Sequence, residues 1–220
     1  MAKLQLVQAL EARARHGRNK FFVDLLRAVP RPLSILDVGG TVDYWRRVDF
    51  PLDTQVRIVL LNTFEQHVDS PFESVVGDAR DLSCYRDREF DVVFSNSVIC
   101  LVGSFADQQC MAREIQRVGQ HFFLQTPNHG FPIDWRTLIP FFHLLPIEAQ
   151  AWCFEHIAVG TYRRARTRAE ALIWASRVRN LRWRDLHVLF PSAEVVAERC
   201  GGFTKSFMVH NFSTFRSGVV

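Results

Sequence analysis

Long hydrophobic runs are missing from this 220-residue chain. The longest apolar stretch, residues 138–147, contains two prolines and is much shorter than the roughly 18 residues that a membrane-spanning helix needs. The first 20 residues are charged and lack the apolar core and small-residue cleavage site of a secretory signal. We therefore expect neither a transmembrane segment nor a leader.

Paired cysteines are also missing. The chain has five cysteines, at positions 84, 100, 110, 153 and 200, and none of them forms a CxxC pair or a zinc-ligand spacing with histidine. This scatter favours free thiols in a reducing compartment, so we expect a cytoplasmic protein without a bound metal.

Lysine is the third scarcity, because Lys3, Lys20 and Lys205 are the only ones. Arginine therefore carries most of the positive charge, and the formal net charge is +4. No RNA-recognition, helix-turn-helix or zinc-finger pattern accompanies this mild excess, so we expect no nucleic-acid partner. Six arginines lie between residues 163 and 179. They indicate either a solvated helix face or a site that binds an anionic molecule, such as a carboxylate or a phosphate.

Short apolar runs alternate with helical patterns through the first half of the chain. Such runs, four to six residues long, are typical of a parallel sheet covered by helices on both faces. The pattern predicts one α/β domain over residues 1–220, beginning with two N-terminal helices within residues 1–30. The predicted elements are helices at 3–15, Asn19–Ala28 and Val102–Gln116, and strands at Ser34–Val38, Val56–Leu61, Ser74–Val76, Asp91–Phe94 and His121–Gln125.

The second half departs from this alternation. Residues 131–182 are rich in proline, tryptophan and phenylalanine. We expect them to form a helical insertion, with a helix over Tyr162–Asn180, that caps the sheet edge on the side where a second substrate would bind. Trp135, Leu138, Phe141, Phe142 and Trp152 are among its apolar residues, which form either a core or the lining of an apolar pocket. The remaining pattern predicts a strand or extended segment at Asp185–Phe190, a helix at Pro191–Cys200 ended by two glycines, and one or two strands within Phe203–Phe215.

Four motifs follow successive predicted strands: DVGGT (37–41), LNT (61–63), GDARDL (77–82) and FSNSVI (94–99). An open parallel sheet gathers the carboxyl ends of its strands at one crevice. There, glycines let the backbone approach a ligand closely, carboxylates accept hydrogen bonds from amines, and amides bond a ribose diol. The candidate ligand-binding residues are Asp37, Gly39, Gly40, Thr41, Asn62, Thr63, Asp78, Ala79, Arg80, Ser95 and Asn96.

The order of these motifs resembles the class I S-adenosylmethionine (SAM)-dependent methyltransferases, and FDVVFSNSVI (90–99) is the most specific match. The resemblance implies a Rossmann-like seven-stranded sheet, mostly parallel with an antiparallel last strand, and SAM bound across the first two strands. It also implies that the eleven candidate residues contact the cofactor.

The sequence departs from the family pattern at three places. Val42-Asp43 stands where a third glycine would fall, Asn62 replaces the usual acidic residue, and Cys100-Leu101 replaces Glu-His. Two hypotheses follow: an active methyltransferase with a different ribose contact, or a non-catalytic SAM-binding or scaffold relative. An NAD-dependent dehydrogenase is disfavoured, since GxGxxG and an acidic second-strand end are both missing.

The acceptor is less well defined than the cofactor. The short chain and the apolar insertion favour a small molecule, with an apolar or aromatic part. His129 and Asp134 follow the fifth predicted strand, where a general base would have to lie within about 3 Å of an acceptor hydroxyl. We therefore take these two as candidate catalytic residues. O-, N- and C-methylation all remain open, and so does the oligomeric state.

Overall fold

A seven-stranded sheet in the order β3-β2-β1-β4-β5-β7-β6 organises the molecule. The computed structural model describes residues 15–134 and 136–212. The first five strands are parallel to one another, whereas β7 is antiparallel to both β5 and β6. This is the Rossmann-like arrangement that the sequence predicts. The strands are β1 (Leu33–Val38), β2 (Val56–Asn62), β3 (Phe72–Val76), β4 (Phe90–Asn96), β5 (Gly119–Pro127), β6 (Glu194–Cys200) and β7 (Phe203–His210).

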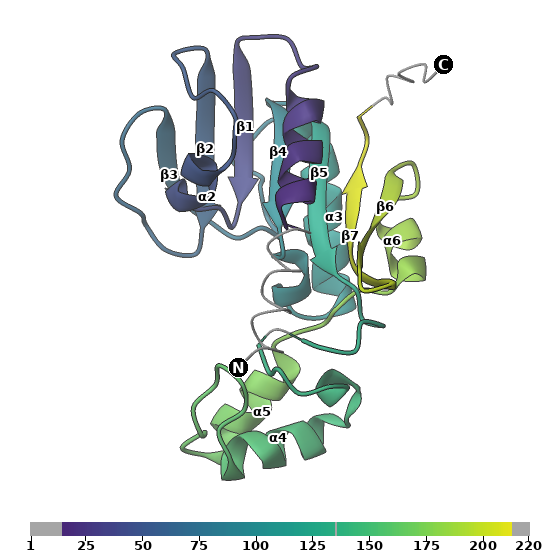
Figure 1. Cartoon of the computed structure of the whole chain (residues 1–220). Helices are drawn as coiled ribbons and strands as arrows, with labels where there is room; N and C mark the ends of the chain where they lie inside the picture. Colours follow the sequence, from purple (N-terminus) through teal and green to yellow (C-terminus); the bar gives the residue numbers. More distant parts are fainter. Residues whose placement is uncertain (1–14, 135, 213–220) are drawn as a thin grey trace.

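Helices cover both faces of this sheet, because successive strand residues point to opposite sides. Ile35 and Ile58 pack on one face with the helix of residues 15–26 and with α2 (Val42–Arg47). Leu36 and Val59 pack on the other face with α3 (Phe105–Val118) and α6 (Trp183–Leu189). The continuous apolar runs in the sequence are thus explained by burial on two sides (Figure 1).

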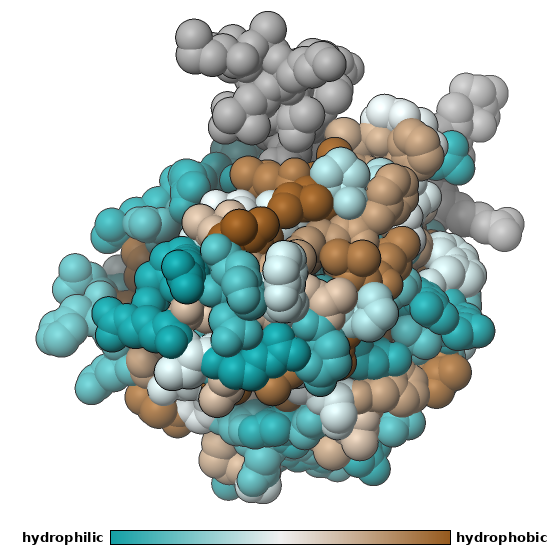
Figure 2. Space-filling model, turned by 90° about the horizontal axis from the view of Figure 1, so that it is seen from below, coloured by the Kyte–Doolittle hydropathy of each residue, from teal (hydrophilic) through white to brown (hydrophobic). Residues whose placement is uncertain are grey.

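A pair of helices, α4 (Ile147–His156) and α5 (Arg168–Ser176), lies beyond the carboxyl ends of the parallel strands (Figure 1). The pair has its own small core, which includes Phe142 of the 3-10 helix η2 (Phe142–Leu144), Ala151 and Phe154. Seen from this end, hydrophobic and hydrophilic side chains form separate patches (Figure 2). The exposed apolar side chains here include Leu138, Phe141, Leu144, Leu145, Ile147 and Trp152.

The prediction of a strand at Asp185–Phe190 is wrong. These residues belong mostly to α6, where the Asp185 carboxylate accepts a hydrogen bond from the Arg182 N–H at 3.0 Å and caps the helix. Leu186, Leu189 and Phe190 are buried at helical spacing on α3 and β5. The apolar content suggested a strand, but this spacing together with the N-terminal cap decides for a helix.

The prediction of a helix at Pro191–Cys200 is also wrong, because β6 occupies Glu194–Cys200. Gly201 and Gly202 have φ values of +57° and +85°, so they form the two-residue turn of a β-hairpin rather than a helix end. The hairpin pairs the edge of β7 with a neighbouring strand. Tertiary pairing therefore outweighs the local helical pattern.

Other boundaries differ from the prediction by smaller amounts. Helix α5 spans only Arg168–Ser176, because Thr167 caps its N-terminus by accepting from the Glu170 N–H. The helix of residues 15–26 includes His16 and Gly17, which lie between the two helices predicted at 3–15 and Asn19–Ala28. The helix predicted at 3–15, Trp135 and the end of the last predicted strand lie largely or wholly outside the described residues. In the part of the chain that the structure describes, no helix is long and apolar enough to span a membrane.

Candidate active site

The loop after β1 requires glycine at two consecutive positions. Gly39 has a φ of +78°, and a Cβ there would lie 2.3 Å from Cγ2 of Val98. A Cβ on Gly40 would lie 1.8 Å from Oδ2 of Asp37. The first glycine is needed for its left-handed backbone and the second for close contact with a buried carboxylate.

Asp37, at the end of β1, is almost completely buried. Its Oδ2 accepts a hydrogen bond from Nε1 of Trp45 at 2.7 Å, whereas its Oδ1 is buried without a partner among the described residues. Burial raises the pKa of Asp37 to about 7, although the indole hydrogen bond opposes this shift. The unpartnered oxygen marks a position where a cationic ligand group would be stabilised.

Asn62, at the end of β2, supports the glycine loop. Its Nδ2 donates to the carbonyl oxygen of Gly40 at 2.9 Å, and Nε2 of Gln66 donates to the same oxygen at 3.0 Å. The second N–H and the side-chain oxygen of Asn62 remain for the ribose contact expected from the sequence. Gln66 was not a sequence candidate, because it belongs to no strand-end motif.

The three polar residues at the end of β4 have different roles. Ser95 is buried, and its hydroxyl donates to the carbonyl oxygen of Val38 at 3.3 Å, which ties β4 to β1. Asn96 has a buried Oδ1 without a partner among the described residues. Ser97 has a φ of +63° and donates its hydroxyl hydrogen to Oε1 of Gln125 at 2.5 Å. Asn96 therefore faces the ligand side, whereas Ser95 lies behind it.

These strand ends border a cavity of about 530 Å³, which we call the strand-end cavity. Its lining contains the candidates Asp37, Gly39, Gly40, Thr41, Asn96 and Asp134. Further lining residues include Arg18, Tyr44, Arg47, Phe94, Ser97, Gln125, Phe131, Ile133, His143 and Lys205. Most of the loop after β1 is thus brought together with residues after β5, as the topology of a parallel sheet predicts.

The predicted adenosine contacts lie outside this cavity. Thr63 is exposed after β2, and Asp78, Ala79 and Arg80 follow β3. Asp78 accepts hydrogen bonds from Nε of Arg80 at 3.0 Å and from its Nη2 at 2.6 Å, and this pairing lowers the pKa of Asp78. Nη1 of Arg80 also donates to Asp107 at 3.0 Å. A purine amine would therefore share the Asp78 carboxylate with Arg80.

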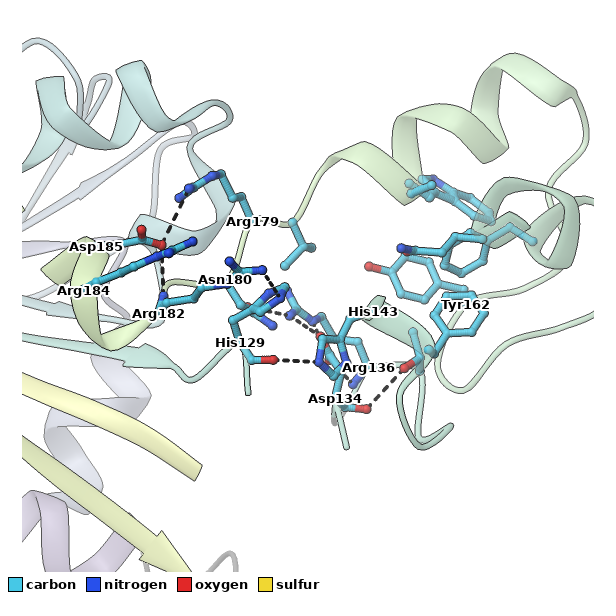
Figure 3. A pocket seen from close by; sticks show the side chains of 17 residues that line it. His129, Asp134, Arg136, His143, Tyr162, Arg179, Asn180, Arg182, Arg184 and Asp185 are labelled. Carbon is cyan, nitrogen blue, oxygen red and sulfur yellow. Dashed lines mark hydrogen bonds and ion pairs between the residues drawn. The ribbon is translucent and has the colours of Figure 1, made fainter. Parts of the chain in front are cut away.

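Two histidines meet beside the strand-end cavity, and their hydrogen bonds fix their tautomers (Figure 3). Nε2 of His129 lies 3.2 Å from Nη2 of Arg182, which can only donate, so Nε2 accepts. Nε2 of His143 lies 2.9 Å from the His129 carbonyl oxygen, which can only accept, so Nε2 donates. Nδ1 of His143 is consequently an acceptor, and it is buried without a partner among the described residues.

His129 is less suited than His143 to receive a proton. The His129 lone pair is directed at a guanidinium, and burial followed by the charge of Arg182 lowers the pKa of His129. The sequence candidate therefore lies in the right region, but the available nitrogen belongs to its neighbour. His143 also follows the fifth predicted strand, but His129 lies nearer the strand end, and no local pattern indicates that the chain brings the two histidines together.

Asp134, the other catalytic candidate, is held in a buried ion pair with Arg136. Nε of Arg136 donates to its Oδ1 at 2.8 Å, and Nη2 donates to its Oδ2 at 2.5 Å (Figure 3). Both carboxylate oxygens are thereby engaged by one guanidinium. This geometry favours a positioning role for Asp134 over proton abstraction.

The donor and acceptor set fits the methionine end of SAM. Oδ1 of Asp37 and Oδ1 of Asn96 are unpartnered acceptors, which suit an ammonium group, and the arginines at 18 and 47 on the same cavity suit a carboxylate. The glycine loop leaves the backbone open to close approach. Among the described residues, no cluster of three or more metal-ligating side chains occurs.

Comparison with known proteins agrees with this geometry. Residues 52–121 match the family model described as a methyltransferase domain. This match supports the sequence resemblance, and S-adenosylmethionine is the cofactor of that class. A search of curated proteins found no match.

Several solved structures share the fold. A possible exported protein from Bordetella parapertussis is 13% identical with a TM-score of 0.55, and the alignment covers 90% of this chain and 67% of that one. The N-terminal domain of EvdMO1 with S-adenosylhomocysteine (SAH) bound is 15% identical with a TM-score of 0.52, covering 90% and 80%. The 1,6-didemethyltoxoflavin-N1-methyltransferase of Burkholderia thailandensis is 10% identical with a TM-score of 0.51, covering 89% and 76%. At identities this low, the structural similarity establishes the fold alone.

Proposed function

We propose that the protein is a class I SAM-dependent methyltransferase and that it methylates a small molecule with an apolar or aromatic part; the fold and the family match over residues 52–121 support this proposal. The observation that carries this proposal is the strand-end cavity. It joins the glycine loop to Phe131, Ile133 and His143, so polar groups suited to the cofactor and apolar groups suited to an acceptor line one space.

Bound SAM supplies a methyl group made electrophilic by a positively charged sulfur. Asp37 and Asn96 would hold its ammonium group through their unpartnered oxygens. Tyr44 and Phe94, stacked at 5.0 Å between ring centroids, form an apolar wall that excludes water from the cavity. The chain thus contributes chiefly positioning and desolvation.

An acceptor hydroxyl must lose its proton as it is methylated, and Nδ1 of His143 is the group proposed to receive it. The His129 carbonyl oxygen fixes the orientation of that imidazole. His129 and Asp134, the catalytic candidates from the sequence, act here through their neighbours: His129 by holding His143, and Asp134 by holding Arg136. An amine acceptor would need the same placement without a strong base.

A non-catalytic SAM-binding protein is the second candidate function. One observation favours it: both catalytic candidates from the sequence are already engaged, Asp134 by Arg136 and the His129 lone pair by Arg182. Such a protein would bind the cofactor without turning it over.

Calorimetric titration with SAM and with SAH tests the cofactor step first. We expect both to bind, with dissociation constants on the order of micromolar. Incubation with methyl-labelled SAM and a panel of small phenols, aromatic acids and amines, followed by mass spectrometry, then tests transfer. Binding of neither compound would refute the proposal. Binding without transfer to any acceptor of the panel would favour the second candidate.

A further inference from the structure

A second cavity, of about 310 Å³, lies between the α4/α5 pair and the body of the sheet (Figure 3). We call it the helix-pair cavity. Asp134, Arg136, His143 and Asn180 line both this space and the strand-end cavity. The two cavities are therefore neighbours separated by a thin wall, and the unpartnered Nδ1 belongs to a residue of that wall.

One side of the helix-pair cavity is aromatic. Phe154, Tyr162 and Trp174 pack against one another, with ring centroids 5.0 Å apart for the first two and 5.4 Å apart for the last two. In Figure 3 the Tyr162 hydroxyl points away from the helix pair, toward the opposite wall. An apolar ring could stack on this side without displacing a polar group.

The opposite side is cationic. Arg179, Arg182 and Arg184 line it, and in Figure 3 they lie across the cavity from Tyr162. With Arg136, the cavity has four arginines against two aspartates, which is a formal excess of two positive charges. Among the described residues Arg184 has no hydrogen-bond or ion-pair partner, so its charge is uncompensated locally.

The two carboxylates of the cavity do not remove this excess. Asp134 is engaged by Arg136. Asp185 accepts from the Arg182 N–H at 3.0 Å and lies 3.6 Å from Nη2 of Arg179. Both carboxylates are thus directed into their own contacts, while guanidinium donors remain for an incoming anion.

Not every arginine of this region faces the cavity. Arg163 pairs with Glu170 at 2.8 Å, and Arg168 pairs with Glu155 at 3.5 Å, both away from the cavity. Of the six arginines between residues 163 and 179, only Arg179 lines the cavity, where Arg182 and Arg184 join it. The cationic side of the cavity is therefore formed by the chain after α5, and most of the earlier arginines belong to the outer surface.

We propose that the helix-pair cavity binds the anionic group, carboxylate or phosphate, of an aromatic acceptor, with Arg184 and Arg182 as its ligands and with Tyr162 and Trp174 against its ring. This assignment rests on the proposed function and adds the charge of the substrate. The reacting atom of such a molecule would lie at the wall containing His143.

Binding of matched probes tests the proposal directly. The probes are 4-hydroxybenzoate, phenyl phosphate and the neutral 4-hydroxybenzamide, each titrated calorimetrically into the full-length protein with and without SAH. At least one of the two anions should bind roughly 10-fold more tightly than the amide, and its affinity should fall as salt is added because exposed arginines contribute. Equal affinity for the acids and the amide would overturn the proposal.

Single substitutions test whether the arginines of the helix-pair cavity are responsible for anion binding. Arg184→Ala should weaken binding of the preferred anion by about 5- to 20-fold. Arg177→Gln removes the same charge from an exposed position outside the cavity, and it should leave that affinity within about 2-fold. Asp185→Asn, which keeps a side-chain acceptor for the helix cap, should tighten binding of the anion. Equal losses for Arg184→Ala and Arg177→Gln would show that only net charge matters, and the proposal would fail.

Titration with SAH separates this inference from the function on which it rests. SAH affinity should be unchanged in all three variants, because none of these side chains lines the strand-end cavity. If wild-type protein binds neither SAM nor SAH, the proposed function fails, while anion selectivity still reports on the helix-pair cavity. If SAH binds but no anion preference exists, only the substrate charge is refuted.

Discussion

The strand-end cavity and the helix-pair cavity differ in how their polar atoms are held. The strand-end cavity has two glycines and the unpartnered oxygens of Asp37 and Asn96. These groups lie at the ends of strands that the sheet holds in register. In the second, long arginine side chains from the segment after α5 face an aromatic cluster. A rigid strand end suits an invariant cofactor, whereas exposed arginine side chains after α5 can change without disturbing the strand ends. Cofactor binding and acceptor choice are thus carried by different parts of the chain.

Gly40→Ala should break the strand-end cavity most severely. The added Cβ would lie 1.8 Å from Oδ2 of Asp37, so the carboxylate or the loop must move. We expect SAH affinity to fall about 100-fold or more, measured by calorimetry. Gly17→Ala is the control, because a Cβ there meets nothing within 4 Å. Normal affinity in a folded Gly40→Ala protein would contradict the tight packing of this loop.

His143→Ala tests the wall between the cavities. For a hydroxyl acceptor we expect kcat to fall by about 100-fold or more, while SAH affinity stays near the wild-type value. His129→Gln should have a smaller effect, since its main-chain carbonyl, which orients His143, is retained. A larger loss in His129→Gln than in His143→Ala would transfer the proton-accepting role to His129.

Asp37→Asn should weaken SAH binding by about 10- to 30-fold, because an ionised acceptor is replaced by a neutral one. In the wild type the pKa of Asp37 is about 7 in the free protein, so affinity should rise as pH increases toward about 7 and level off above it. The variant should not show this rise. A wild-type affinity that is constant between about pH 5.5 and 8.5 would remove Asp37 from the ammonium site.

The raised pKa of Asp37 also predicts that the stability of the unliganded protein falls as pH increases, whereas cofactor affinity rises. Because the folded-state pKa of Asp37 is raised above its ordinary value of 3.8, the unfolded chain ionises first as pH rises. The free energy of unfolding should therefore fall between about pH 4 and pH 7. Asp37→Asn should remove this cost and stabilise the unliganded protein at neutral pH by about 1–3 kcal/mol, measured by urea denaturation. If the variant loses cofactor affinity but gains stability, the loss of affinity is due to the missing carboxylate and not to unfolding.

Asp78→Ala should have the smallest effect on the cofactor. Its carboxylate is exposed and shared with Arg80, so we expect SAH affinity to fall by only about 2- to 5-fold. Arg80→Ala is the matched variant, because it frees the Asp78 carboxylate. If Arg80→Ala weakens binding more than Asp78→Ala does, the purine contact belongs to the arginine.

The strand-end motifs could be found from sequence because parallel strands have local signatures. Continuous apolar runs ending in DVGG and in SNS indicate both the strand and the edge at which it ends. Strand order and the crevice then follow from the general topology of such sheets. The errors fall after residue 180, where β6 forms a strand because the edge of β7 pairs with it, and α6 is a helix because its apolar residues recur at helical spacing.

The sequence by itself determined the five parallel strands and the glycine loop, and the resemblance of its motifs indicated the kind of cofactor, since each depends on short contiguous segments. Only the tertiary structure decided which polar atoms are free to act. The Asn62 amide nitrogen is engaged by the loop, the His129 lone pair faces Arg182, and Nδ1 of His143 is left available. These outcomes depend on pairings across tens of residues, and no local pattern encodes them. The same holds for the arginines of the second half of the chain, since folding pairs Arg163 with Glu170 on the surface and places Arg179, Arg182 and Arg184 on the helix-pair cavity.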